Sequence, residues 1–196
     1  MSDPLFAAQD DAATPLEPDE REQLIPTYIT TRAELNQAEQ IGVADADRWA
    51  FARRRDVLSE DFIRALHRRM FAGVWRWAGA FRTTERNIGV DAHAIGVRLR
   101  QLLDDVRYWI EHETYTPDEI AVRFHHGLVA IHPFPNGNGR LSRMEADLLA
   151  VRLGRPRFSW GSANLVQPAE TRRLYIQALR AADNHDHRPL IAFARS

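Results

Sequence analysis

The sequence contains no cysteine, no lysine and no long apolar run. Without cysteine, the chain can have neither disulfide bonds nor thiolate catalysis, and any zinc site would have to use other ligands. No apolar stretch approaches the roughly 18 residues that suggest a membrane span, so we expect no membrane segment. The start of the chain also lacks a basic region followed by an apolar one, so we expect no secretory signal and a cytoplasmic location.

Net charge is almost absent as well. The 196 residues include 27 acidic and 26 basic side chains, all of the latter arginine, for a net charge of −1. Such a balanced chain has no global basic field, so we do not expect nucleic acid as a partner. Arginine favours bidentate contacts to phosphate, although a bias in genomic composition explains the missing lysine equally well. The hydrophobic content of 44% suffices for one sizeable core.

Length and local composition predict one domain preceded by a short arm. Residues 1–20 contain six acids, three prolines and no basic residue, which is typical of a flexible acidic segment. We therefore expect an acidic N-terminal arm over residues 1–24 and a single domain over residues 25–196.

Helical periodicity dominates the domain. A helix cap is expected at Thr30 or Thr31, at Ser59, at Asp91 and at Thr116, and Thr116 begins a capping-box pattern. The segment over residues 74–90 is rich in turn-forming and β-branched residues, which predicts an irregular loop or a small β-hairpin. The predicted fold class is an all-α helical bundle with one small β-hairpin. The expected helices cover about residues 31–41, 45–55, 60–70, 91–112, 117–131, 138–153 and 168–182, with a short helix after residue 188.

The most informative segment runs from His132 to Arg143 and reads HPFPNGNGRLSR. An apolar helix must end at His132, because Pro133 and Pro135 cannot continue it. A glycine-rich turn follows, and a new helix begins near Asn138. The chain therefore places a histidine, a flexible turn and a helix N-terminus next to one another.

This arrangement predicts a site for a polyphosphate. Gly137 and Gly139 allow positive φ values and the close approach of a ligand, and the first amides of the new helix are unpaired. Arg140 and Arg143 add two guanidinium groups on one helical face, where they oppose the helix dipole unless an anion offsets them. His132, with an ordinary pKa of about 6.5, is a suitable base for a hydroxyl group. The segment thus predicts transfer of a phosphorus group to an alcohol.

The same twelve residues resemble the signature of the Fic family, His-Pro-Phe-x-(Asp/Glu)-Gly-Asn-Gly-Arg-x-x-Arg, at every fixed position except one. Residues 77–82 are similar to the segment that precedes a target-docking flap in the family. Residues 175–190 are similar to the final helical segment of the family. Residues 30–40 resemble a subgroup called mobile mystery protein B. The resemblance spans about residues 25–193 and implies a Fic-type helical fold and a protein adenylyltransferase. Such an enzyme transfers AMP from ATP to a Ser, Thr or Tyr hydroxyl of a target protein.

The resemblance also implies a role for each matching residue. His132 is the expected general base, and Phe134 is expected to be buried and to hold the loop. The phosphates of ATP are expected to contact Gly137, Asn138, Gly139, Arg140 and Arg143. The flap, which is expected to bind the target backbone by strand addition, comprises Thr83, Thr84, Asn87, Ile88 and Gly89.

Asn136 is the position that departs from the signature, which has Asp or Glu there to hold magnesium. A neutral amide oxygen is a weaker ligand for this hard cation, so we expect Mg²⁺, or Mn²⁺, to be held weakly, without a carboxylate ligand and with Asn136 assisting. Three outcomes remain open. The metal binds through ATP and water, the enzyme is slow or uses another nucleotide, or the site binds nucleotide without turnover.

Two glutamates are candidates for an inhibitory contact. Many Fic proteins carry a glutamate that pairs with the second motif arginine, here Arg143, and blocks a phosphate position. Glu39 and Glu34 each match that pattern incompletely, and both also fit the pattern of solvated helix residues. Mechanistically, a carboxylate against Arg143 competes with phosphate for the same guanidinium.

Two other functions remain as alternatives to adenylyl transfer. One is a catalytically weak or inactive nucleotide-binding module of regulatory or toxin–antitoxin type, with an antitoxin-like or neighbouring regulatory protein as partner. The other is a different reaction at the same phosphate site, either that of a phosphotransferase or removal of AMP.

Overall fold

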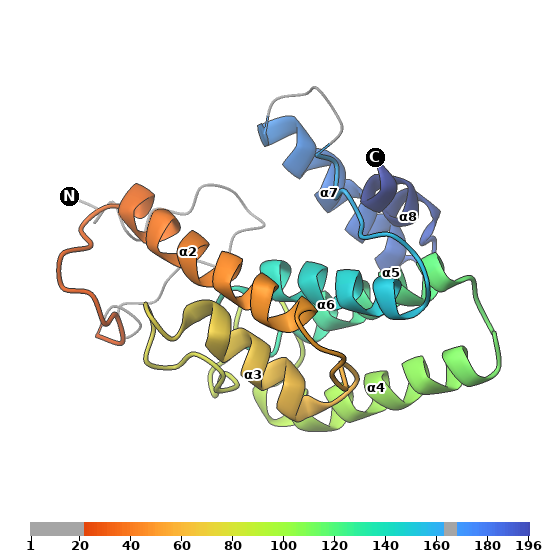
Figure 1. The fold of residues 1–196 in the computed structure, drawn as a ribbon, viewed down its shortest axis with the longest axis horizontal. Helices are drawn as coiled ribbons and strands as arrows, with labels where there is room; N and C mark the ends of the chain where they lie inside the picture. Colours follow the sequence, from red (N-terminus) through yellow and green to blue (C-terminus); the bar gives the residue numbers. More distant parts are fainter. Residues whose placement is uncertain (1–21, 163–167) are drawn as a thin grey trace.

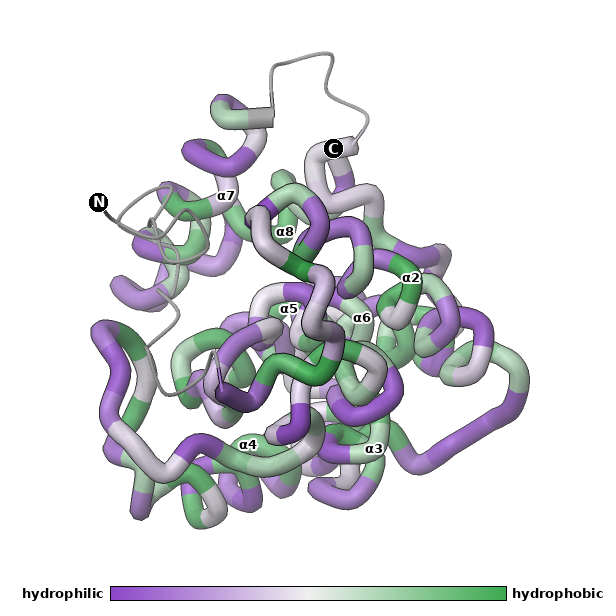
Figure 2. Tube along the Cα trace, turned by 90° about the vertical axis from the view of Figure 1, so that its left-hand side faces the viewer, coloured by the Kyte–Doolittle hydropathy of each residue, from purple (hydrophilic) through white to green (hydrophobic). Residues whose placement is uncertain are grey.

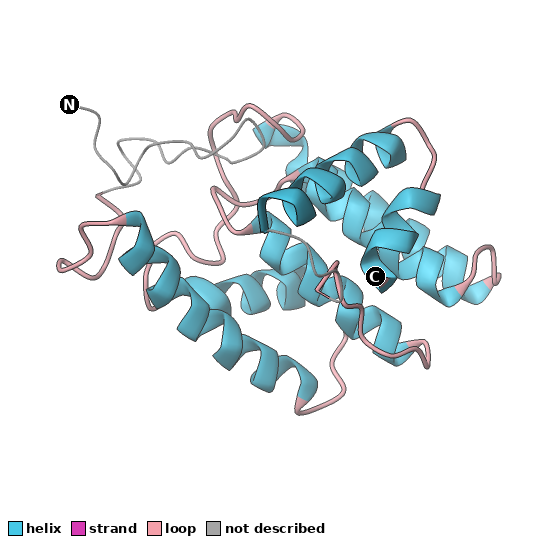
Figure 3. Cartoon of the chain, turned by 90° about the horizontal axis from the view of Figure 1, so that it is seen from above, coloured by secondary structure: helices cyan, strands magenta, loops and turns pink. Residues whose placement is uncertain are grey.

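The computed structural model describes residues 22–162 and 168–196, and within these ranges it contains helices and no strand (Figure 3). The predicted all-α class is confirmed. In chain order the helices are α2 (Arg32–Phe51), α3 (Glu60–Phe71), the 3₁₀ helix η1 (Ala92–Ala94), α4 (Ile95–Glu111), α5 (Pro117–Ile131), α6 (Asn138–Arg152), α7 (Pro168–Asp183) and α8 (Arg188–Arg195).

Helices α5 and α6 form the centre of the bundle (Figure 1). Helix α4 packs on α5, α2 and α3 pack on each other and on α6, and α8 packs on α5. Side chains of the central pair such as Phe124 and Leu149 are at most 1% exposed. Hydrophilic and hydrophobic residues are interspersed along the helices, as is expected when one face of a helix is buried (Figure 2). None of the helices described here is long and apolar enough to cross a membrane.

The predicted caps at Thr31, Ser59 and Thr116 are confirmed. The Thr31 side chain accepts a hydrogen bond from the Glu34 amide, and the Glu34 side chain accepts from the Thr31 amide, which completes a capping box. The Ser59 and Thr116 hydroxyls likewise accept bonds from amides three residues later. The expected return bond from Glu119 is replaced by an ion pair with Arg123 on the same helix.

Two helix boundaries differ from the prediction. The expected break between residues 41 and 45 is wrong, because α2 continues through Gly42. A Cβ at Gly42 would lie 2.2 Å from the Met70 carbonyl oxygen, so glycine allows α2 to pack closely on α3, and this packing supports the helix. Asp91 forms no side-chain cap to α4; η1 comes first, and Glu85 accepts a bond from the Ala92 amide.

The small β-hairpin expected within residues 74–90 is wrong, since this segment is an irregular loop. Its backbone pairs with other parts of the chain. The Arg82 amide donates to the Pro133 carbonyl and the Val90 amide to the Ile131 carbonyl, so groups that would pair across a hairpin are bonded to the end of α5. The one bridge described near this loop joins Leu24 to Trp75.

The predicted division into an arm and a domain stays a prediction. Residues 1–21 of the expected arm lie outside the described residues, so most of that prediction stays untested. Residues 23–25, in contrast, run antiparallel to residues 74–76 and exchange backbone hydrogen bonds with them. The packed domain therefore begins before residue 25.

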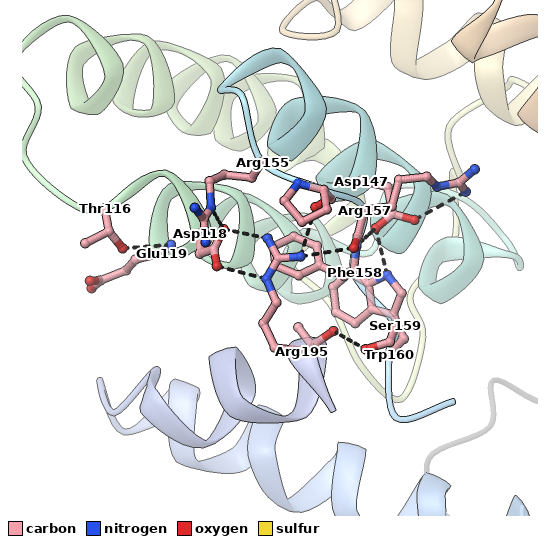
Figure 4. A network of polar contacts seen from close by, with 12 residues as sticks. Thr116, Asp118, Glu119, Asp147, Arg155, Arg157, Phe158, Ser159, Trp160 and Arg195 are labelled. Carbon is pink, nitrogen blue, oxygen red and sulfur yellow. Dashed lines mark hydrogen bonds and ion pairs between the residues drawn. The ribbon is translucent and has the colours of Figure 1, made fainter. Parts of the chain in front are cut away.

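An ion-pair network joins α5 to the C-terminal part of the chain (Figure 4). Arg195 of α8 donates to both carboxylate oxygens of Asp118 on α5, at 2.5 and 2.8 Å. Arg155 donates to the same carboxylate at 3.0 Å. Nearby, Asp147 accepts bonds from the Phe158 amide and the Trp160 indole, which fixes the segment after α6.

We expect Asp118→Asn to lower the free energy of unfolding at pH 7 by about 1–3 kcal/mol, the range for hydrogen bonds to charged groups. The Arg195 guanidinium, followed by Arg155, lowers the pKa of Asp118. The stabilisation is therefore present above the unfolded pKa of about 3.9 and disappears as the pH falls through the lower folded value. Urea unfolding at pH 7 and near pH 3 measures the difference; an equal difference at both values would contradict the assignment.

Candidate functional site

His132 follows α5 in the left-handed region of backbone conformation, with φ 53° and ψ 60°. The residue is 6% exposed, and its amide donates to the Leu128 carbonyl at 3.0 Å. Its own carbonyl accepts a 2.7 Å bond from the Arg82 side chain. A non-glycine residue is uncommon in the left-handed region, so these contacts stabilise the His132 backbone there. The chain therefore changes direction directly after α5.

The His132 imidazole is neutral near pH 7. Burial, followed by the positive charge of Arg82, lowers the pKa of His132 to about 4, and Arg86 acts in the same direction. A hydrogen bond with the backbone of Val129 opposes them in part. A neutral imidazole can accept a proton, so the ring has the protonation state that a general base needs.

Phe134 is fully buried beneath the turn, and its expected role in holding the loop stays a prediction. Its ring stacks on His67 of α3 at a centroid distance of 3.7 Å, and its edge meets Phe81. The His67 Nδ1 accepts a bond from the Gly79 amide, and Nε2 bonds the Asn136 carbonyl at 3.0 Å. Because Nδ1 is the acceptor, Nε2 carries the proton, and burial keeps the ring neutral by lowering the pKa of His67 to about 3.

The Asn138 side chain closes the turn, and its expected role as a phosphate ligand stays a prediction. Its side-chain oxygen accepts from the Phe134 amide at 2.9 Å, and its side-chain nitrogen donates to the Phe134 carbonyl at 2.8 Å. The residue is 3% exposed. Both polar atoms of the Asn138 side chain are thus used to close the turn.

The N-terminus of α6 has the features of an anion site. Gly137 caps the helix at φ 81°, and a Cβ there would lie 2.5 Å from Cε2 of Phe71. Glycine is therefore required both by backbone conformation and by packing. Within the described part of the chain, the amides of Asn138 and Gly139 have no acceptor, so they remain available to a phosphate group.

Arg140 is held by an acid from another helix. Its Nη1 lies 2.8 Å from the carboxylate of Glu39 on α2, and its guanidinium lies over the Phe71 ring at 4.7 Å. The other carboxylate oxygen of Glu39 accepts a 2.7 Å bond from the Trp75 indole. Glu39 is 4% exposed, so Arg140 is paired with a buried carboxylate in this structure.

Of the two glutamates considered as inhibitors, only Glu39 contacts a motif residue among those described. Its partner is Arg140, and the expected contact with Arg143 is not found. Glu34 is exposed and caps its own helix, where hydrogen bonds to Thr30 and Thr31 lower the pKa of its carboxyl group.

Arg143 lies against a different set of side chains. Its guanidinium is 5.6 Å from the ring centroid of Tyr175 on α7, and it hydrogen-bonds that side chain. The Tyr175 hydroxyl is 3.1 Å from Nε2 of His125, a fully buried residue of α5. Helices α5 and α7 therefore position the second motif arginine, whereas α2 holds the first.

The five residues expected to form the flap lie in one exposed stretch between Arg82 and Val90: Thr83, Thr84, Asn87, Ile88 and Gly89. This stretch ends directly beside His132. A Cβ on Gly89 would lie 2.7 Å from the Cβ of His132, and Gly89 has φ 109°. The structure therefore brings the predicted flap into contact with the predicted base, although as a loop.

The residues around Asn136 offer few ligands to a metal ion. Its side-chain oxygen already accepts a 2.6 Å bond from the Gly137 amide, which leaves one lone pair on a neutral oxygen. Glu145, the next acid in the sequence, is fully buried, and burial raises its pKa well above the ordinary value, which disfavours the charged form that binds a metal ion. In the described ranges no group of three or more His, Asp or Glu side chains could hold a metal ion.

Several residues that shape the site were not assigned a role from the sequence. His67, Arg82, Trp75 and Tyr175 each contact a motif residue or its partner from a distant part of the chain. Arg82 and Tyr175 stand in segments that resembled the family, which was the available signal. His67 and the Trp75–Glu39 bond had no local signal. Packing of α3 against the turn after α5 brings His67 to Phe134 and Asn136, and packing of α2 brings Glu39 to Trp75.

Comparison with known proteins identifies the family. Residues 57–150 match the model of the Fic/DOC family. The chain is 32% identical over 146 residues to "Protein adenylyltransferase fic-1" of Caenorhabditis elegans, a match covering 72% of this chain and 27% of that protein. A second relative, "Protein adenylyltransferase Fic" of Drosophila grimshawi, is 32% identical over 132 residues, covering 65% of this chain and 26% of the relative. The chain belongs to the Fic/DOC family, and it spans about a quarter of the length of these relatives.

Solved structures show the same fold. The structure of C. elegans Fic-1, residues 134–508, superposes with a TM-score of 0.66 at 28% identity, covering 90% of this chain and 51% of that one. BepC of Bartonella tribocorum, solved with bound AMPPNP, superposes with a TM-score of 0.68 over 91% of this chain and 97% of its own, at 18% identity. The second likeness concerns the fold alone.

Proposed function

We propose that this chain transfers AMP from ATP to a Ser, Thr or Tyr hydroxyl of a protein. One observation carries the proposal. The neutral imidazole of His132 belongs to the turn that leads into the N-terminus of α6, and that N-terminus has no side-chain cap. The family membership supports the same reaction, since the relatives named above are adenylyltransferases. In the proposed step, His132 accepts the hydroxyl proton while the oxygen attacks the α-phosphorus, and pyrophosphate leaves.

The remaining residues have supporting roles in this proposal. The amides of Asn138 and Gly139 bind phosphate oxygens at the helix N-terminus, and Gly137 makes their approach possible. Arg140 and Arg143 neutralise the outer phosphates. Phe134 and the Asn138 side chain keep the turn rigid, and the loop of residues 83–89 binds the backbone of the target beside His132.

Magnesium or manganese fits this site only weakly. Asn136 is the motif side chain that would assist in holding the ion, together with ATP and water, and its single neutral oxygen is already shared with the Gly137 amide. A bound ion supplies additional charge neutralisation to the phosphates.

A second candidate function is nucleotide binding with little turnover, in a regulatory module. The pairing of Arg140 with Glu39 favours it, since one of the two phosphate-binding arginines is engaged. We propose that the Glu39–Arg140 pair inhibits phosphate binding within the chain. An antitoxin-like or other regulatory partner would control this inhibition by moving α2 relative to α6.

The test is incubation of the chain with ATP labelled at the α- or the γ-phosphate, with Mg²⁺ or Mn²⁺ and a cell lysate. Label in protein from the α-phosphate alone supports adenylyl transfer, and label from the γ-phosphate identifies a phosphotransferase instead. Tight ATP binding without either label supports the regulatory module.

We expect Asn136→Asp to increase metal-dependent labelling. Aspartate has the same shape and keeps an acceptor for the Gly137 amide, while it adds the negative charge that Mg²⁺ prefers. The Mg²⁺ concentration for half-maximal labelling should fall about tenfold or more, in line with one added charged ligand. A titration of labelling against Mg²⁺ measures it, and an unchanged midpoint would show that metal affinity does not limit this site.

A further inference from the structure

Arg82 is a buried arginine whose side-chain donors go mainly to the main chain around His132. The side chain is 1% exposed. Its Nε donates to the His132 carbonyl at 2.7 Å, its Nη1 to the Thr84 carbonyl at 3.0 Å, and its Nη2 to the Val90 carbonyl. Nη2 also lies 3.5 Å from the Ile131 carbonyl. One side chain therefore binds both the end of α5 and the two ends of the loop beside it.

The carbonyls of Ile131 and His132 belong to the last turn of α5, where the helix dipole places negative charge. A guanidinium satisfies several of them at fixed angles, which a lysine ammonium cannot do. The Arg82 amide donates to the Pro133 carbonyl as well, so residue 82 holds both sides of His132. The left-handed conformation of His132 is maintained by these bonds together with the close packing of Gly89.

We propose that Arg82 is the positioning residue for His132: it holds the imidazole in place by binding the main chain at residues 131–133 and couples it to the loop of residues 83–90. The kinetic part of this inference rests on the proposed adenylyl transfer. Arg82 touches neither reacting atom, and it acts through the backbone of the base. The positive charge of Arg82 is repelled by that of Arg86. It is offset in part by the carboxylate of Glu85, which lies 3.7 Å from Nη1 of Arg82.

The experiment compares Arg82→Gln and Arg82→Lys with Arg195→Gln. Arg195 is a matched control, because it also donates to two backbone carbonyls and a carboxylate but lies on α8, in the network around Asp118. Both Arg82 variants should lower kcat about 100-fold, the cost of misplacing a catalytic group by about 1 Å, with KM for ATP changed less than about twofold. Lysine keeps the charge but loses the fork, so it should not restore kcat. Arg195→Gln should lower thermal stability and leave kcat unchanged.

A second readout does not depend on turnover. Ring resonances of His132, assigned with His132→Ala, report its titration midpoint and its mobility in each variant. In both Arg82 variants we expect broadened resonances, and in Arg82→Gln, which loses the positive charge, a midpoint above the wild-type value of about 4. Folded Arg82→Gln with wild-type resonances and wild-type kcat would overturn the inference, as would a change confined to KM.

The readouts separate this inference from the proposed function. If wild type transfers no AMP, the proposed function fails, while the His132 resonances still test Arg82. If neither Arg82 variant folds, Gly89→Ala disturbs the same junction from the exposed side, because its Cβ would lie 2.8 Å from Nη2 of Arg82 and 2.7 Å from Cβ of His132. It should shift and broaden the His132 resonances, and unaltered resonances would count against Arg82 as the positioning residue.

Discussion

Replacing His132 with alanine should lower the rate of AMP transfer by about 10²–10⁴-fold, the usual contribution of a general base. ATP affinity should change little, because the proposed phosphate contacts come from α6. The measurement is transfer of label from α-labelled ATP at saturating nucleotide, with ATP binding followed separately by calorimetry. Retained binding with lost transfer assigns the imidazole to chemistry.

The pH dependence of the wild type provides an independent check on the same residue. The base must be neutral, and burial together with Arg82 lowers the pKa of His132 to about 4. The acid limb of kcat/KM, which reports the free enzyme, should therefore fall below about pH 5, and the profile should be flat up to about pH 8. An acid limb centred near 6.5 would contradict the lowered pKa of His132, and a His132→Ala variant with full activity would remove His132 as the base.

Glu39→Gln should increase ATP affinity about 10- to 100-fold. The carboxylate of Glu39 lies 2.8 Å from Arg140 and occupies a guanidinium that we propose for phosphate. Glutamine keeps an oxygen for the Trp75 indole but loses the charge, so phosphate no longer competes with an anion for Arg140. The range corresponds to one or two powers of ten for a charged hydrogen bond worth about 1.5–3 kcal/mol. Calorimetric titration with ATP and α-label transfer measure the two consequences.

Glu34→Gln is the matched control for this prediction. Both glutamates lie on α2, but Glu34 is exposed and bonded to the cap of its own helix. Its replacement should lower the thermal stability through the weakened cap and leave ATP affinity unchanged. If Glu39→Gln left both ATP affinity and transfer at wild-type levels, the pair with Arg140 would be structural only.

Short-range patterns predicted much of the fold and the core of the candidate site. The caps at Thr31, Ser59 and Thr116 depend on residues three positions apart, so the sequence displays them directly. The end of α5 at His132 follows from Pro133 in the same way. The prediction divided α2 into two helices, because a glycine usually indicates a helix end. At Gly42 the glycine instead allows a close contact with α3, and this contact supports the helix.

The contacts of the Asn138 side chain and the form of the flap could not be predicted for a related reason. Asn138 is four residues from Phe134, and nothing in the pattern tells whether an amide side chain turns toward its own loop or toward a ligand. The loop of residues 83–90 was expected to pair with itself, but its backbone finds better partners in the free carbonyls at the end of α5.

The sequence by itself determined that this protein is a cysteine-free helical bundle with a histidine, a glycine-rich turn and two arginines in one segment. These properties depend on composition and on neighbours within about one helical turn. Only the tertiary structure decided that Glu39 meets Arg140, that Tyr175 meets Arg143 and that Arg82 holds His132. Such contacts join residues 32 to 101 positions apart, and their geometry exists only after the apolar faces of α2, α5, α6 and α7 have packed together.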